Sequence, residues 1–328
     1  MTHDKPLLRL IGTPGRMADH IRRDRITLGS IKSVVIDEFD KSLEIGYEKE
    51  MKEIISALYS LNKKILTSAT KKQEVPAFME FRNPICLNFL NQKSDALDLS
   101  WIQAPENTLN SLLDFLKAMG DKRGIIFCNL KNTLDGVSEF LNDNHVEHAS
   151  FYGGMEQIDR ERSLIQFRNE SQRILLATDL AARGIDIPGL DYIIHYEMPQ
   201  REEEFTHRNG RTARMNQNGA AYCMKGKSDR VPEYANNIRI GQHLEGPQIP
   251  KNKWCTLFIS GGRRDKISKG DLAGLFIKKG GLKNDELGVI ELKTDCAFVA
   301  VYRDKAVAVC ETLNNERLKK KKVRVRKI

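Results

Sequence analysis

The feature that most constrains the fold is an alternation, through most of the chain, of short apolar segments with amphipathic helical patterns. The helical pattern is clearest where Leu109, Leu112, Leu116 and Met119 recur at helical spacing. Short apolar runs bounded by polar residues read as buried strands. These runs are Ser33–Ile36, Lys64–Leu66, Gly124–Cys128, Arg173–Ala177 and Tyr192–His195. Alternating strands and helices imply an α/β fold, in which helices cover a parallel sheet on both faces.

The last quarter of the chain has a different order of elements. Its pattern predicts strand, helix, two strands, helix and strand, which is the ferredoxin-like (RRM-type) α+β arrangement of RNA-recognition domains. The predicted elements are Thr256–Ser260, Lys269–Lys279, Leu287–Lys293, Ala297–Tyr302, Ala306–Leu313 and Val323–Arg326.

Two polar stretches divide the chain into three parts. Asn91–Asp98 and Gly241–Asn252 read as linkers, and the second contains a Gly-Pro pair. We therefore expect domains at residues 1–92, 93–243 and 252–328. A complete α/β nucleotide-binding domain needs about 150–200 residues. The first domain is therefore expected to be partial, with the chain truncated at its N-terminus.

Positive charge is concentrated at one end of the chain. The net charge is +9, and residues 251–328 alone contain 20 Lys and Arg against 9 Asp and Glu. This asymmetry indicates a polyanion-binding module joined to a nearly neutral body, with a solvated basic tail as the alternative. Two basic clusters are the candidate RNA contacts of this module: Arg263, Arg264, Lys266, Lys269, Lys319, Lys320, Lys321, Lys322, Arg324 and Arg326.

The terminal cluster has the alternation of a strand. Val323 and Val325 alternate with basic residues, so one face of that strand can be buried while the other is basic. Few aromatic residues lie on the predicted strands, so we expect RNA contacts through Lys, Arg and loops more than through base stacking.

Composition excludes several classes of protein. Apolar residues make up 40% of the chain and charged residues 30%, which is typical of a soluble globular protein. No apolar run approaches the ~20 residues that span a bilayer, and Met1–Asp4 lack a secretory pattern. The six cysteines form no Cys-x-x-Cys pair, which favours a reduced, cytoplasmic compartment. We expect a monomer without a membrane partner.

An acidic turn follows the first strand. Asp37-Glu38-Phe39-Asp40 comes directly after Ile36, and ligands of parallel α/β sheets bind at the carboxyl ends of the strands. There Asp37 can hold Mg²⁺ on the phosphates of a nucleotide, and Glu38 can orient or deprotonate the attacking water. The alternative is an acidic first turn of a helix.

A basic segment at His207–Arg214 is the second candidate site. Arg211 and Arg214 are three residues apart, so they share a face if the turn is helical. Two guanidinium groups on one face can clamp a terminal phosphate and stabilise charge during its transfer, and a solvated basic helix is the alternative. Residues 221–228 match a loose Gly-Lys-Ser phosphate loop, but Tyr222, Cys223 and Met224 predict a strand instead.

Taken in order, these segments resemble the DEAD-box RNA helicases. The resemblance spans residues 7–230 and covers motifs Ib (Thr13–Arg16), II (Asp37–Asp40), III (Ser68–Thr70), IV and IVa (Gly154, Gln157, Arg160), V (Ala177–Asp186) and VI (His207–Arg214). The final domain is similar to the RNA-recognition-like domain of bacterial members that bind 23S ribosomal RNA. The matching stretches are Thr256–Gly262, Lys266–Asp271 and Lys321–Lys327.

The resemblance implies RecA-like domains that bind ATP and Mg²⁺, and a role for each matching residue. Asp37 is the residue on the magnesium side and Glu38 the catalytic carboxylate. Arg211 meets the γ-phosphate, and Arg214 is the arginine finger. The remaining roles are ATP binding for Gly184 and Asp186, coupling of ATP state to RNA for Asp40, Ser68, Thr70 and His207, and RNA-backbone contact for Thr13, Arg16, Gly154, Gln157, Arg160 and Thr178.

The sequence departs from the family pattern in three places. Phe39 stands where the family has Ala, Ala213 replaces a Gly, and the 36 residues before Asp37 contain no Gln motif and no Walker A loop. We expect an ATP-dependent RNA helicase that remodels 23S rRNA in pre-50S particles during large-subunit assembly. The alternatives are a catalytically incompetent RNA-binding fragment without the Walker A loop, and a truncated gene model whose start lies upstream.

Overall fold

The structure is a computed structural model in which the chain divides into two units, residues 1–93 and 94–328. Each unit is described by itself. No helix in the part of the chain that the structure describes could cross a membrane. The described residues are 9–44, 46–68, 75–81, 83–89, 97–104, 107–179, 189–212, 219–227, 229–241 and 246–328.

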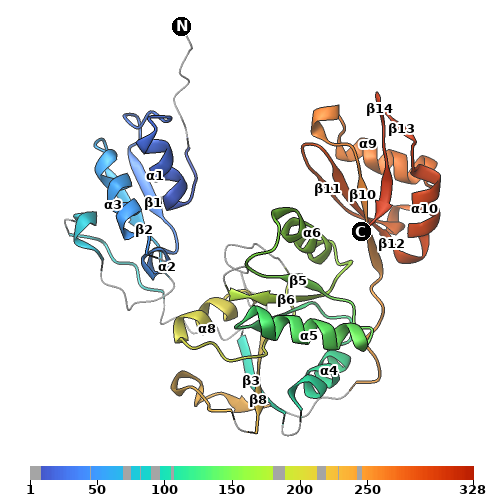
Figure 1. The fold of residues 1–328 in the computed structure, drawn as a ribbon, viewed down its shortest axis with the longest axis horizontal. Helices are drawn as coiled ribbons and strands as arrows, with labels where there is room; N and C mark the ends of the chain where they lie inside the picture. The colour runs from blue at the N-terminus through green and yellow to red at the C-terminus, as the bar shows by residue number, and fades with distance from the viewer. Residues whose placement is uncertain are drawn as a thin grey trace. The chain divides into compact units, whose positions relative to one another are not determined.

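The first unit has a small parallel sheet with helices packed beside it (Figure 1). Its two strands pair in register from Ser33↔Lys63 to Ile36↔Leu66. Helix α1 begins at Pro14, which suits a first helical position because its missing N–H would have no intrahelical partner. The elements are α1 (Pro14–Arg22), β1 (Ser33–Ile36), α2 (Phe39–Glu44), α3 (Glu48–Ala57), β2 (Lys63–Leu66) and the 3₁₀ turn η1 (Ala77–Met79).

Both strands of this unit were expected to be buried, and that expectation is wrong. No residue of β1 or β2 is buried, and Val35 is 59% exposed. The strands form where the sequence predicts them, but the described part of this unit supplies only two strands and cannot enclose them. Burial of the unit is confined to a few side chains, among them Ala18 of α1, Met51 of α3 and Phe39 of α2.

The second unit contains a seven-stranded sheet with strand order β5-β6-β4-β7-β8-β3-β9. All neighbouring strands run parallel, as the alternation of strands and helices predicts. The strands are β3 (Leu97–Ala104), β4 (Gly124–Cys128), β5 (Ala149–Phe151), β6 (Ile174–Thr178), β7 (Tyr192–His195), β8 (Gly219–Gly226) and β9 (Arg239–Ile240).

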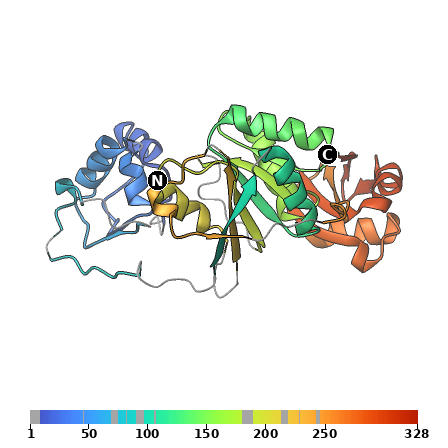
Figure 2. The ribbon, with the colours of Figure 1, turned by 90° about the horizontal axis from the view of Figure 1, so that it is seen from below.

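Helices cover this sheet on both faces, and α5 lies across one of them (Figures 1 and 2). Every residue of the central strands β4, β6 and β7 is buried. Leu116 of α4 and Val137 of α5 pack on one face with Ile126, while Phe167 of α6 packs on the other with Ile125. The helices are α4 (Thr108–Met119), α5 (Lys131–Asp143), α6 (Gln157–Arg168) and α8 (Glu202–Asn209).

In this unit one sequence prediction needs correction, one is confirmed, and three strands were not predicted. The predicted linker Asn91–Asp98 overlaps β3, which begins at Leu97, and the strands not predicted are β3, β5 and β9. The match to a phosphate loop at residues 221–228 falls largely within β8, where Ala221 and Cys223 are fully buried core residues. A strand, rather than a phosphate cradle, is therefore confirmed there.

The C-terminal module of the second unit has the predicted β-α-β-β-α-β order. Its antiparallel sheet has strand order β11-β12-β10-β15, and Leu257, Val299 and Phe276 lie in the core under its helices. A two-stranded hairpin, absent from the prediction, precedes the last strand. The elements are β10 (Trp254–Ile259), α9 (Lys269–Gly274) with a π-helical turn (Leu275–Lys279), β11 (Leu287–Leu292), β12 (Ala297–Tyr302), α10 (Ala306–Leu313), β13 (Arg317–Leu318), β14 (Lys321–Lys322) and β15 (Val325–Lys327).

Candidate functional site

The acidic turn lies at the carboxyl end of β1, as predicted. Asp37 is exposed, and its Oδ1 accepts hydrogen bonds from the backbone N–H of Glu38 (3.1 Å) and from the Thr67 hydroxyl. The backbone N–H of Phe39 donates to the Thr67 carbonyl at 3.0 Å. These bonds place the acidic turn beside the end of β2, next to Ser68. Thr70 lies outside the described residues.

The backbone of this turn is unusual at Glu38. Its φ of +47° lies in the left-handed region, which non-glycine residues rarely adopt. The next two residues, Phe39 and Asp40, are buried and begin α2. The acidic turn therefore begins at the accessible Asp37 and ends at the buried Asp40. An exposed carboxylate beside phosphate oxygens and waters is the kind of donor set that Mg²⁺ accepts.

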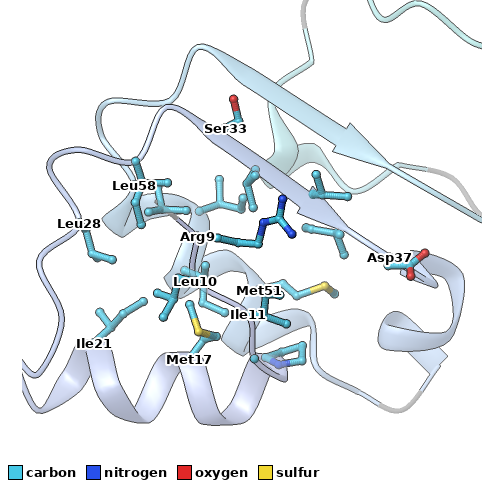
Figure 3. Close-up of a pocket in the computed structure, with 18 of the residues that line it drawn as sticks. Arg9, Leu10, Ile11, Met17, Ile21, Leu28, Ser33, Asp37, Met51 and Leu58 are labelled. Carbon is cyan, nitrogen blue, oxygen red and sulfur yellow. The ribbon is translucent and has the colours of Figure 1, made fainter. Parts of the chain in front are cut away.

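A hollow with mostly apolar lining residues, and with Arg9 among them, lies beside the acidic turn in the first unit (Figure 3). It has a volume of about 850 Å³, and Leu10, Ile11, Met17 and Ile21 are among its lining residues. Figure 3 shows these side chains around the hollow, with Asp37 beyond them at the end of β1. One accessible face of the small sheet is therefore apolar, in keeping with the exposure of Val35.

In the second unit, the predicted nucleic-acid contacts gather at the carboxyl edge of the parallel sheet. Thr178 is the last residue of β6, and Gly154, Gln157 and Arg160 follow β5, its neighbour. Gly154 has a φ of +89°, a conformation that suits glycine, and an added Cβ there would meet open space. Gly184 and Asp186 of the same motif set lie outside the described residues.

Arg160 is held in place by stacking. Its guanidinium lies 5.0 Å from the centre of the Phe151 ring. Its Nε is buried and has no hydrogen-bond partner among the described residues. With Gln157 at the first position of α6, Arg160 therefore presents an unsatisfied donor close to this edge of the sheet.

A buried network centred on Arg208 was missed in the sequence. Its side chain is 1% exposed and forms two hydrogen bonds with Asp179, Nε–Oδ1 at 2.7 Å and Nη2–Oδ2 at 2.6 Å. It also donates to the Asn129 side chain (2.7 Å) and to the Glu197 carbonyl (2.9 Å). The network ties the ends of β4, β6 and β7 to α8. Asp179 follows Thr178 directly, so the network fixes the end of β6.

His195 lies beside this network and is fully buried. Its Nε2 is 3.0 Å from Oδ1 of Asn209, and its ring stacks near Phe205 with a centroid distance of 4.6 Å. Burial, with a smaller contribution from the nearby Arg208 charge, lowers the pKa of His195 to about 3. The imidazole is therefore neutral at physiological pH and acts as a packing and hydrogen-bonding group.

The second half of the basic motif is only partly described. Helix α8 ends at Asn209, so Arg211 lies in the turn beyond it rather than on a helical face, and its N–H donates to the Arg208 carbonyl at 3.0 Å. The expected helical pairing of Arg211 with Arg214 is therefore not provided by α8, and Arg214 lies outside the described residues. His207 is half-buried in the last turn of α8.

The structure brings the two basic clusters of the C-terminal module together. Lys319 Nζ contacts Asp271 Oδ2 at 2.7 Å and donates to the Lys266 carbonyl at 2.7 Å. Lys321 Nζ contacts Asp265 Oδ2 at 2.7 Å. The Lys319 ammonium, together with Ser268, lowers the pKa of Asp271 to about 2. The β13–β14 hairpin is thereby fastened to the loop that carries the first cluster.

Several basic residues of this combined surface have no acidic partner in the part of the chain that the structure describes. Arg264, in contrast, pairs with Asp295 at 3.0 Å. The unpaired and exposed residues are Arg263, Lys266, Lys269, Lys320, Lys322, Arg324 and Arg326. The ordered hairpin and the fully buried Val323 argue against a frayed basic tail.

Aromatic side chains are better organised on the module's sheet than the sequence suggested. Phe258 and Phe298 on paired strands meet at 5.7 Å, and Trp254 and Tyr302 at 5.5 Å. Both pairs lie on the sheet face opposite the helices, because the residues that alternate with them form the core. The signal for this face was present in the sequence. Aligning the two strands as antiparallel neighbours places Phe258 opposite Phe298 and Trp254 opposite Tyr302.

Comparison with known families gives three matches along the chain. Residues 5–78 match the DEAD/DEAH box helicase model, residues 107–216 the helicase conserved C-terminal domain, and residues 256–327 the DbpA RNA binding domain.

Relatives and solved structures agree with these matches. The chain is 28% identical to the ATP-dependent RNA helicase DbpA of Escherichia coli and to that of Bacillus subtilis, covering 97% of this chain and 72% and 74% of theirs. It is 34% identical to the ATP-dependent RNA helicase HAS1 of Candida albicans over 75% of this chain and 44% of that protein. Saccharomyces cerevisiae Dbp5 bound to RNA and ADP BeF3 has a similar fold, with a TM-score of 0.59 at 22% identity, over 70% of this chain and 64% of that one. The expected fold class, RecA-like parallel sheets followed by an RNA-binding antiparallel sheet, is confirmed.

Proposed function

Because this chain belongs to the DEAD-box RNA helicase family and carries an RNA-binding domain of the DbpA type, we propose that it remodels ribosomal RNA at the expense of ATP. In this proposal the C-terminal module recognises structured 23S rRNA in pre-50S particles, and the helicase body acts on RNA nearby. We propose a cytoplasmic, monomeric protein with domains at residues 1–92, 93–243 and 252–328.

ATP and Mg²⁺ are the cofactors of this proposal. Bound Mg²⁺ neutralises phosphate charge and polarises the bond to be broken. The exposed carboxylate of Asp37 suits the magnesium side, and Glu38 orients or deprotonates the attacking water. Arg211 would contact the γ-phosphate. We assign ATP binding to Gly184, Asp186 and Arg214 by family resemblance alone. The proposed residues that couple ATP state to RNA are Asp40, Ser68, Thr70 and His207, and the assignment of Thr70 also rests on the resemblance alone.

The observation that carries the RNA part of this proposal is the gathering of Gly154, Gln157, Arg160 and Thr178 at one edge of the sheet. The Arg208–Asp179 pair supports it, because the pair holds the chain immediately after Thr178. Thr13 and Arg16, exposed at the start of α1, are the proposed RNA contacts of the first unit.

ATP hydrolysis tests the enzymatic part. Residues 1–36 contain no phosphate loop, so we expect the polypeptide 1–328 to show RNA-stimulated turnover no higher than background. Joined to an N-terminal segment that carries such a loop, it should hydrolyse ATP. In this joined chain Glu38→Gln should then lower turnover by about a hundredfold or more, because the attacking water loses its base. Glu48→Gln, at an exposed position of α3, is the control. Robust turnover by residues 1–328 alone would contradict this assignment.

RNA affinity tests the module, and the ion pairs sharpen the test. Lys320 and Lys322 are exposed without acidic partners, whereas Lys319 and Lys321 are paired with Asp271 and Asp265. Changing Lys320 and Lys322 together to Ala should weaken binding of all RNAs about tenfold and reduce the slope of log affinity against log salt by about 2. Filter binding at several salt concentrations measures both quantities. Equal effects of the Lys319/Lys321 double variant would show that the ion pairs do not withhold charge from RNA.

A further inference from the structure

Helix α6 is polar around most of its circumference. Of its twelve residues only Ser163, Ile165 and Phe167 are buried. A helix of this kind can bridge two bodies, while its Phe167 packs on the parallel sheet. Its first turn carries Gln157 and Arg160, and a neighbouring stripe at helical spacing carries Asp159, Arg162 and Gln166.

The C-terminal end of α6 is fastened to the sheet of the C-terminal module. Arg168 donates two hydrogen bonds, each 2.9 Å, to the carboxylate of Glu291, and Lys293 contacts Glu161 at 2.6 Å. Just beyond the helix, Thr256 Oγ1 is 2.8 Å from Asn169 Nδ2 and 2.6 Å from Ser171 Oγ, all buried. Polar groups buried with partners hold a specific geometry. The helix and the module therefore keep a defined spacing.

A cleft of about 490 Å³ lies between α6 and β15. Asp159, Arg162 and Gln166 line one wall, and Arg326 and Lys327 line the other. Asp159 pairs with Arg162 at 3.0 Å, whereas Arg326 and Lys327 have no ion-pair partner in the described chain. The basic side chains of the cleft exceed its acidic ones.

Arg326 is positioned by an aromatic ring. Its guanidinium lies 4.9 Å from the centre of Phe258, one of the paired aromatics of the sheet. The ring contacts the guanidinium on one side while Arg326 stays exposed, which is an arrangement suited to a phosphodiester or a stacked base.

We propose that this cleft binds the sugar-phosphate backbone of a single RNA strand that passes between the helicase body and the C-terminal module. Lys327 is its first phosphate contact, and Arg162 is the second once its guanidinium leaves the pair with Asp159. The inference rests on the proposed function, since it names the path of the same RNA. RNA is favoured over an acidic peptide because Gln157 and Arg160, the proposed RNA contacts of the body, lie on the same helix as the cleft residues Arg162 and Gln166. That helix is about 18 Å long. A strand in the cleft would join RNA held at the body to RNA held by the module.

Three RNAs test the proposal on residues 1–328: a 23S rRNA hairpin selected for binding to this chain, a single strand of about ten nucleotides, and the hairpin carrying that strand at its 5′ or its 3′ end. The extension should raise the affinity of the unchanged chain about tenfold or more. Lys327→Ala should remove most of that gain while leaving affinity for the hairpin alone unchanged, and the salt slope for the extended RNA should fall by about 1. Arg162→Ala should remove a smaller part of the gain, because this guanidinium must first leave Asp159.

Lys278→Ala is the matched control, since Lys278 is exposed on the helical side of the module. It should change neither the gain nor the slope, and thermal unfolding should show that all variants keep their fold. The cleft is rejected if Lys327→Ala weakens the hairpin and the extended RNA equally, or if the extension still raises the affinity of that variant fully. In both cases the hairpin still binds the unchanged chain, so the proposed function stands. If no RNA binds the chain at all, the proposed function and the cleft both fail.

Discussion

The parallel sheets of the two units contain strands of similar sequence, but the two sheets differ in how many strands and helices surround those strands. Strand β1 reads Ser-Val-Val-Ile and strand β4 reads Gly-Ile-Ile-Phe-Cys, both short apolar runs followed by polar site residues. Every residue of β4 is buried, whereas none of β1 is. The run of apolar residues therefore predicts a strand in both places, and only the number of neighbouring strands and helices decides whether that strand is enclosed.

Hydrogen exchange gives the most direct test of this comparison, with the largest expected effect. Amides of β4 lie in the centre of a seven-stranded sheet, while those of β1 lie in a two-stranded one. We expect the amides of Ile125–Phe127 to exchange about a hundredfold or more slowly than those of Val34–Ile36, because opening a partly exposed sheet costs little free energy. Residues 1–92 should also be cleaved by proteases before residues 99–240. Equal protection of both strands would mean that the hollow in the first unit is closed in solution.

The second prediction contrasts ion pairs of the two units. Arg208 and Asp179 are paired with the arginine 1% exposed, whereas Arg22 and Glu53 form a pair on the surface of the first unit, with Arg22 half exposed. Arg208→Ala should destabilise the second unit by about 3–5 kcal/mol, because it leaves a partly buried carboxylate and the Asn129 side chain without their donor. Arg22→Ala should have no measurable effect.

Tryptophan fluorescence during denaturant unfolding measures this difference for the second unit. The chain has two tryptophans, Trp101 and Trp254, and both belong to that unit. Circular dichroism monitors the first unit in the Arg22 variant. A loss below about 1 kcal/mol in Arg208→Ala would show that water or another group replaces the guanidinium.

How far the sequence predicts this molecule follows from the range of the interactions concerned. Strand positions are set by local apolar runs, and β1, β4, β7 and β12 occur where those runs lie. Side-chain contacts between residues far apart in the sequence could not be predicted. Arg208 and Asp179 are 29 residues apart, and α8 opens with three glutamates, so its pattern resembles a solvated helix.

The same limit applies to the basic module. Composition locates the positive charge, and the sequence order correctly suggests two clusters. It does not reveal that Lys319 and Lys321 are paired with Asp271 and Asp265, some fifty positions earlier. The number of charges free to meet RNA is therefore smaller than a count of lysines and arginines suggests, and the difference depends on the hairpin geometry.

The smallest expected effect concerns pH and extends the comparison, because the buried histidine belongs to the enclosed sheet. The folded-state pKa of His195 is lowered to about 3, whereas an unfolded histidine titrates near 6.5. Between those values the unfolded chain binds a proton that the folded one does not, so stability falls as pH falls. Between pH 7.5 and pH 5.5 the loss should be about 1.4 kcal/mol from this residue. Burial also lowers the pKa of His148, which adds to the loss of stability at low pH.

Tryptophan-monitored unfolding across this pH range should show a shallower pH dependence in His195→Gln than in the unchanged chain. His145→Gln, at an exposed position, should leave the slope as it was. If His195→Gln keeps the full slope, the imidazole is protonated in the folded state and the packing around Phe205 and Asn209 opens to water.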